Sequence, residues 1–167
     1  GNDPLYFATT STPLFLTRWI THFCAPAFVF LAGASIFFSG NKKTKKELSL
    51  FLLSRGLWLI ILELTVVGFG WMFDPQFKLI FLQVIWVIGF SMVCMSVLIF
   101  LPHTVILFIG LLLVFGHNLL DTVHVKGNTV ESLLWSILHE PGKFMLSESH
   151  SVFIAYPVLP WLGLMMS

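Results

Sequence analysis

The chain has 167 residues, of which 57% are hydrophobic and only 10% are charged, and its net charge is +1. Soluble domains carry about 25% charged residues, so this composition disfavours a soluble fold and indicates an integral membrane protein with the lipid bilayer as its solvent. The near-neutral charge gives no support to nucleic-acid binding. Two cysteines without zinc-like spacing predict no disulfide framework.

Both ends of the chain are unusual for a complete membrane protein. Residues 1–13 are polar and lack the basic start of a signal peptide, and the chain stops at Ser167 inside an apolar run. We therefore expect residues 1–167 to form one transmembrane domain that is a portion of a larger one.

Five apolar segments approach the roughly 20 residues that a helix needs to cross a bilayer. They predict an all-α polytopic transmembrane helix bundle of about four to five spans. Pro26 predicts a kink in the first span, and the last span is cut short. The expected spans are 12–38, 48–73, 77–101, 104–120 and 151–167.

Basic residues predict how the bundle is oriented. The 41–46 loop and the nearby Arg55 hold five of the nine lysines and arginines, so we place this end in the cytoplasm. A loop whose lysines are merely solvated is the alternative. The cytoplasmic placement puts most polar groups at the other, extracytoplasmic level: Arg18, His22, Asp74, His117, Asp121, His124, His139, Glu140 and His150.

Arg18 and His22 are four residues apart and share one helix face. One interpretation is an anion-binding arginine beside an acid–base histidine. The other is that Arg18 reaches the lipid headgroups while His22 hydrogen-bonds a carbonyl.

Glu63 lies eight residues beyond Arg55, about 12 Å deeper along the predicted second span. A carboxylate there costs roughly 2.5–3.5 kcal/mol unless it is paired or protonated. We expect a buried partner across the bundle, and a role in proton handling or substrate contact is the alternative.

His117, Asn118 and Asp121 end the fourth predicted span. If the helix persists, Asp121 lies one turn from His117 and can fix its tautomer, as suits a general base. The alternative is a plain helix end, where His117 meets free carbonyls and Asp121 opens a turn.

The segment 122–150 predicts an amphipathic helix on the outer membrane surface. Asn128 and Glu131 resemble a capping box, and Pro141 follows the apolar stripe. His139 and Glu140 at the helix end either reach the mouth of a cavity or form a solvated pair. The histidine spacing does not match a zinc motif, so we predict no metal site.

Several stretches together resemble the heparan-alpha-glucosaminide N-acetyltransferase-like family of bacterial membrane proteins. Polar residues inside the spans take part in the resemblance, which covers nearly the whole chain from about Pro13. The matching stretches are LTRWITHFCAPAFVFLAG, SRGLWLIILELTVV, HNLLD, LLWSILHEPGKF and YPVLPWLGLM.

This resemblance implies a multi-helix acyltransferase of the bacterial inner membrane. It implies transfer of acetyl from acetyl-CoA to an amino or hydroxyl group of an extracytoplasmic sugar or glycan. The family has an earlier span with an aspartate–histidine pair that this chain lacks, so we do not expect the segment alone to be active.

The roles assigned under this interpretation are hypotheses. His117, Asp121 and His22 are the catalytic candidates, and the substrate-binding candidates are Arg18, His139, Glu63 and Asn118. A homo-oligomer is left open. The rival hypothesis is a proton-coupled transporter or permease, in which Glu63 and the histidines form a relay.

Overall fold

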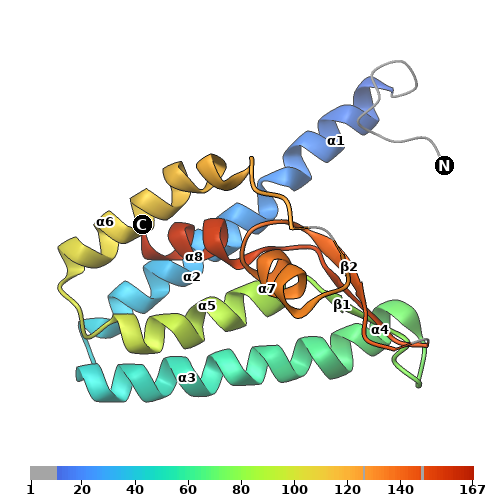
Figure 1. The fold of residues 1–167 in the computed structure, drawn as a ribbon. Helices are drawn as coiled ribbons and strands as arrows, with labels where there is room; N and C mark the ends of the chain where they lie inside the picture. The colour runs from blue at the N-terminus through green and yellow to red at the C-terminus, as the bar shows by residue number, and fades with distance from the viewer. Residues whose placement is uncertain (1–10, 126, 148) are drawn as a thin grey trace.

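The computed structural model describes residues 11–125, 127–147 and 149–167. Most of the polar N-terminal segment therefore lies outside the described residues. Within them, eight α-helices, two short helical turns and three β-strands follow one another (Figure 1).

Three continuous helical stretches are long and apolar enough to cross a membrane: Thr12–Gly40, Lys45–Met72 and His103–Leu120. They coincide with the first, second and fourth predicted spans. The first consists of α1 (Thr12–His22) and α2 (Cys24–Gly40), which are separated at Phe23. Pro26 explains the break, because its ring has no N–H and clashes with the carbonyl of the preceding turn.

The second stretch changes helical type on the way. It begins as α3 (Lys45–Leu62), capped by Thr44, whose hydroxyl accepts a hydrogen bond from the Glu47 N–H at 3.3 Å. It then passes through a π-helical turn, η1 (Glu63–Val67), into α4 (Gly68–Met72). The third stretch is α6 (His103–Gly116) followed by a 3₁₀ turn, η2 (His117–Leu120).

The prediction of an all-α fold is wrong for two segments, because the mostly helical chain also contains a small sheet. Strand β1 (Leu79–Leu82) occupies the start of the predicted 77–101 span, and β3 (Ser151–Ile154) the start of the 151–167 span. With β2 (Gly142–Met145) they form a sheet of order β1-β3-β2, parallel between β1 and β3 and antiparallel between β2 and β3.

The helix that follows β1, α5 (Val84–Leu98), is shorter than a span, and α8 (Val158–Met166) follows β3. Short apolar runs fit a buried strand and a buried helix equally well, so composition alone could not separate them. Pro157 and Pro160 lie at the start of α8, where the missing N–H costs little, rather than inside a long helix.

The predicted loop helix is present as α7 (Val130–Leu138), but its cap differs from the prediction. Thr129 is the N-cap, and its hydroxyl accepts a hydrogen bond from the Ser132 N–H. Asn128 instead donates to the Met145 carbonyl at 2.7 Å and accepts from the Met145 N–H at 2.9 Å, tying α7 to β2. The location of α7 on a membrane surface stays a prediction.

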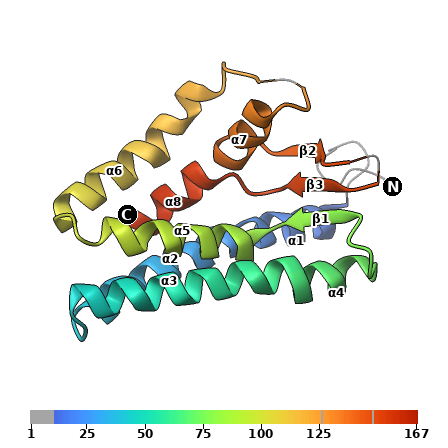
Figure 2. The same ribbon diagram turned by 60° about the horizontal axis from the view of Figure 1, so that its bottom comes forward.

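Two buried clusters hold the fold together. One lies among α2, α3, α5, α6 and α8 and includes Val29, Leu52 and Met165; the other joins the sheet to α5 and α8 around Val87 and Ile154. Both views show the sheet near α4 at one end of the bundle, and the α2–α3 and α5–α6 turns at the other (Figure 2).

Glycines bring the helices of the first cluster into contact. A Cβ added at Gly56 on α3 would lie 2.6 Å from the carbonyl oxygen of Gly89 on α5. A Cβ added at Gly163 on α8 would lie 3.0 Å from the carbonyl oxygen of Gly110 on α6. Small residues at such crossings let backbones approach closely, which is a common way for helices to associate in membranes.

Candidate active site

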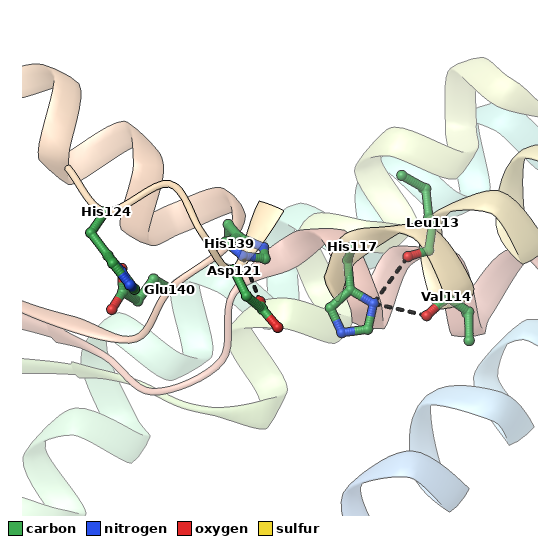
Figure 3. Close-up of polar contacts among 7 residues, drawn as sticks. All are labelled: Leu113, Val114, His117, Asp121, His124, His139 and Glu140. Carbon is green, nitrogen blue, oxygen red and sulfur yellow. Dashed lines mark hydrogen bonds and ion pairs between the residues drawn. The ribbon is translucent and has the colours of Figure 1, made fainter. Parts of the chain in front are cut away.

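His117 stands where α6 tightens into the 3₁₀ turn η2, and backbone atoms hold its ring. Its Nδ1 lies 2.8 Å from the Val114 carbonyl oxygen and 3.2 Å from that of Leu113 (Figure 3). Carbonyl oxygens only accept hydrogen bonds, so Nδ1 is the donor and carries the hydrogen. In the neutral ring Nε2 therefore has the free lone pair that a general base needs.

Of the two interpretations of this helix end, the structure agrees with the one in which His117 meets free backbone carbonyls, whereas Asp121 does not pair with His117. Its Oδ1 lies instead 3.0 Å from Nε2 of His139, the residue that ends α7. The histidine side chain is only 5% exposed, whereas the carboxylate is 62% exposed and lies at the surface. Backbone carbonyls thus orient the ring of His117, and the Asp121 carboxylate contacts a second histidine, His139.

The change of helical type explains this different pairing. In an α-helix, residues four apart are neighbours on one face, which would place Asp121 next to His117. In a 3₁₀ helix with three residues per turn, residues three apart eclipse and a residue four apart is turned aside. The segment from His117 to Leu120 is 3₁₀, so Asp121 is directed toward α7.

His139 links the two halves of this site. Its ring meets the His117 ring edge-on at a centroid distance of 6.3 Å, and it lies 5.2 Å from the ring of Trp135. Nδ1 of His139 and Nε1 of Trp135 are both buried without a hydrogen-bond partner in the described part of the chain. We did not predict a role for Trp135 from the sequence, although its spacing of four residues from His139 on one helix signals the contact.

A second histidine–carboxylate pair lies nearby and is more exposed. Nδ1 of His124 is 3.2 Å from Oε2 of Glu140, and both side chains are about half exposed. Figure 3 shows this pair beside the Asp121–His139 contact. The pair connects the segment after η2 to the end of α7, and its exposure limits its contribution to stability to about 1 kcal/mol or less.

Glu63 is buried and has a backbone partner. Its side chain is 1% exposed, and Oε1 accepts a hydrogen bond from the Gln83 N–H at 2.7 Å. Gln83 is the N-cap of α5, so the carboxyl group lies at the positive end of that helix. The other oxygen, Oε2, has no hydrogen-bond partner among the described residues. The expected partner across the bundle is thus a helix start rather than a side chain.

The structure does not bring Arg18 and His22 to His117. Both are exposed on α1, which has no buried residue and extends away from the bundle in Figure 1. Asn118 is exposed on η2 beside His117, and its carbonyl accepts the Asp121 N–H at 3.2 Å. Only Asp121, His139 and Asn118 among the predicted residues therefore accompany His117.

Groups of three or more metal-ligating side chains do not occur among the residues that the structure describes. What the site holds is one imidazole fixed for proton abstraction, a second imidazole on a carboxylate, and an aromatic ring. Such an arrangement can take a proton from an incoming nucleophile and stabilise charge close to it.

The model of the heparan-alpha-glucosaminide N-acetyltransferase catalytic family matches residues 3–167. No curated protein and no solved structure matches the chain.

Proposed function

Because the chain belongs to the heparan-alpha-glucosaminide N-acetyltransferase catalytic family, we propose that it works in a membrane-embedded acetyltransferase. The family is of the acetyltransferase type and uses acetyl-CoA as its donor. The proposed acceptor is an amino or hydroxyl group of an extracytoplasmic sugar. The observation that carries the proposal for this site is the fixed Nδ1–H of His117, which leaves Nε2 free for a proton.

His117 acts as the general base in this proposal. Its Nε2 takes the proton of the acceptor amine or hydroxyl while the acceptor attacks the acetyl carbonyl. The new carbon–nitrogen or carbon–oxygen bond forms, the carbon–sulfur bond of the thioester breaks, and His117 passes its proton to the leaving thiolate. The hydrogen bonds from Nδ1 to the Val114 and Leu113 carbonyls keep the ring in one tautomer throughout.

Asp121 and His139 act through position rather than by contact with the reacting atoms. The contact between Asp121 and His139 keeps the second ring edge-on to His117, and Trp135 packs against the ring of His139. Asn118, beside His117, remains a proposed acceptor contact. Arg18 and His22 lie exposed on α1, away from His117, so they are not assigned a contact with the same acceptor. Glu63 is proposed as a structural cap of α5 rather than a substrate ligand.

The three apolar helices and the family together indicate an integral membrane protein. We propose the bacterial inner membrane, with the 41–46 loop in the cytoplasm. His103 and His117 stand at opposite ends of α6, about 21 Å apart at 1.5 Å per residue. In this orientation the donor approaches from the lysine end and the acceptor from the His117 end.

The test is turnover of the intact protein in proteoliposomes, with labelled acetyl-CoA as donor and glucosamine as acceptor. His117→Ala should lower turnover at least tenfold, because general-base catalysis contributes about 10²–10⁴-fold. His124→Ala is the matched control, since it removes an exposed histidine of the same region. Unchanged turnover in His117→Ala would exclude this residue as the base.

Binding of acetyl-CoA separates the acetyltransferase from the proton-coupled permease. The intact acetyltransferase should bind the donor in the absence of acceptor. A permease should show no acetyl-CoA binding, and should instead acidify or alkalinise the liposome interior when a substrate gradient is applied.

A further inference from the structure

A groove lies at the end of the bundle opposite the sheet. It has a volume of about 590 Å³ and is bounded by α2, α5, α6 and α8. Its wall is mostly apolar and includes Phe37, Met95, Ile106 and Leu164. This volume falls in the range of small-molecule sites, roughly 300–1,000 Å³. The groove is separate from the His117 site, which stands at the other end of α6.

Two lysines give the groove a cationic rim. Lys43 and Lys45 both line it, together with Asn41 and His103. Nζ of Lys45 donates to the Phe100 carbonyl at 3.3 Å, and Nζ of Lys43 lies 5.1 Å from the centroid of the Phe51 ring. Both lysines are exposed, and these contacts place their ammonium groups beside the ends of the helices.

The start of α6 adds a second positive feature to the same rim. Its N-cap is Pro102, its first turn contains no acidic residue, and His103 and Thr104 line the groove. The first backbone N–H groups of a helix have no partner within it, so they attract anions. The acidic side chain nearest in sequence to the lysines is Glu47, and its carboxylate accepts hydrogen bonds from the N–H and hydroxyl of Thr44.

We propose that this groove binds one anionic phospholipid, with its phosphate between Lys43, Lys45 and the start of α6 and an acyl chain along the apolar wall. A soluble phosphate compound shares the headgroup chemistry but has no acyl chain to pack along the apolar wall. Basic pockets between membrane helices bind anionic headgroups in this way. The lipid is distinct from donor and acceptor, and the proposal does not depend on the proposed acetyl transfer.

The experiment measures lipid binding to the intact protein in nanodiscs and by native mass spectrometry, not turnover. Phosphatidylglycerol is compared with phosphatidylcholine of the same chains. Lys43→Gln with Lys45→Gln should weaken phosphatidylglycerol binding at least tenfold, because each lysine near an anionic surface contributes substantially. Lys42→Gln with Lys46→Gln is the matched control, since it removes the same charge from two lysines that do not line the groove.

A further variant, Ala34→Phe, fills the groove without changing charge and should also weaken binding. Its melting temperature without added lipid shows whether it is folded. Retention of one phosphatidylglycerol, lost in the Lys43/Lys45 and Ala34 variants and kept in the control, supports the proposal. Equal loss in both lysine pairs, equal binding of phosphatidylcholine, displacement by coenzyme A or inorganic phosphate, or no bound lipid would overturn it.

Discussion

The glycine at the crossing of α6 and α8 offers a direct test of how the fold supports the site. A Cβ added at Gly163 would lie 2.8 Å from Leu113 Cβ, 3.0 Å from the Gly110 carbonyl oxygen and 3.1 Å from Val114 Cγ2. Two of these atoms belong to the residues whose carbonyls hold His117. We therefore expect Gly163→Ala to affect both stability and turnover.

The magnitude follows from two opposing effects. Overpacking costs about 1–3 kcal/mol, and the backbone oxygen and Cβ atoms here cannot rotate away, which favours the upper end. Alanine gains about 1 kcal/mol over glycine in a helix, which partly offsets this cost. A net loss of about 2 kcal/mol corresponds to a fall in Tm of roughly 4–8 °C for a domain of 150–250 residues.

Thermal unfolding of the detergent-purified intact protein measures this difference. Gly70→Ala is the matched control, because no atom lies within 4 Å of its added Cβ, and it should raise Tm by about 2–4 °C. Well below Tm, turnover of Gly163→Ala should also fall, since α6 must shift under the His117 ring. A Tm for Gly163→Ala equal to or above that of the natural protein would refute the close packing of α6 and α8.

Variants at three further residues test individual polar groups. Glu63→Leu should lower the free energy of unfolding by about 1–3 kcal/mol, because it leaves the Gln83 N–H unpaired. Glu63→Gln keeps an acceptor and should have a Tm near that of the natural protein. A Glu63→Gln variant that is stable but inactive would instead favour the proton relay. Asp121→Ala should lower turnover by less than tenfold because its contact with His139 is largely exposed, and a loss as large as that of His117→Ala would make it catalytic. Hydrogen bonds from the Gln76 and Lys78 N–H groups hold the pKa of Asp74 below its ordinary value of 3.8. The stability that Asp74 contributes is therefore complete above that pH and is lost as pH falls through the lowered pKa. Hydrogen exchange of this turn should accelerate in acid, and Asp74→Asn should remove that pH dependence.

The lipid-solvated class of the chain and its family could be predicted from the residues alone. Length and unbroken apolarity are sufficient to identify a spanning helix, and they located three stretches that coincide with Thr12–Gly40, Lys45–Met72 and His103–Leu120. The choice of His117 as a candidate base stays a prediction; its place at a helix end supplies carbonyl partners for its ring. The family was predicted from the resemblance of five stretches of the chain, polar residues inside spans included, and the match over residues 3–167 confirms it.

The partners of those polar residues could not be predicted. Pairing of His117 with Asp121 by α-helical spacing was one of two interpretations of this helix end, but the 3₁₀ turn directs Asp121 to His139, which is 18 residues further along the chain. Glu63 was expected to need a partner, yet nothing in its neighbourhood indicates the Gln83 backbone N–H. Such contacts depend on how separate elements pack, which no local pattern encodes.

Local hydrophobicity thus determined which segments are long and apolar enough to cross a membrane, since transfer from water to lipid depends on each residue's own surface. Tertiary structure alone decided that residues 79–82 and 151–154 pair as strands, because apolar side chains suit strand and helix equally and only a bonded neighbour separates the two. It also decided which imidazole meets which carboxylate and where the lysine rim meets an apolar groove. Those arrangements join residues far apart in the chain, so their physical cause is packing rather than sequence spacing.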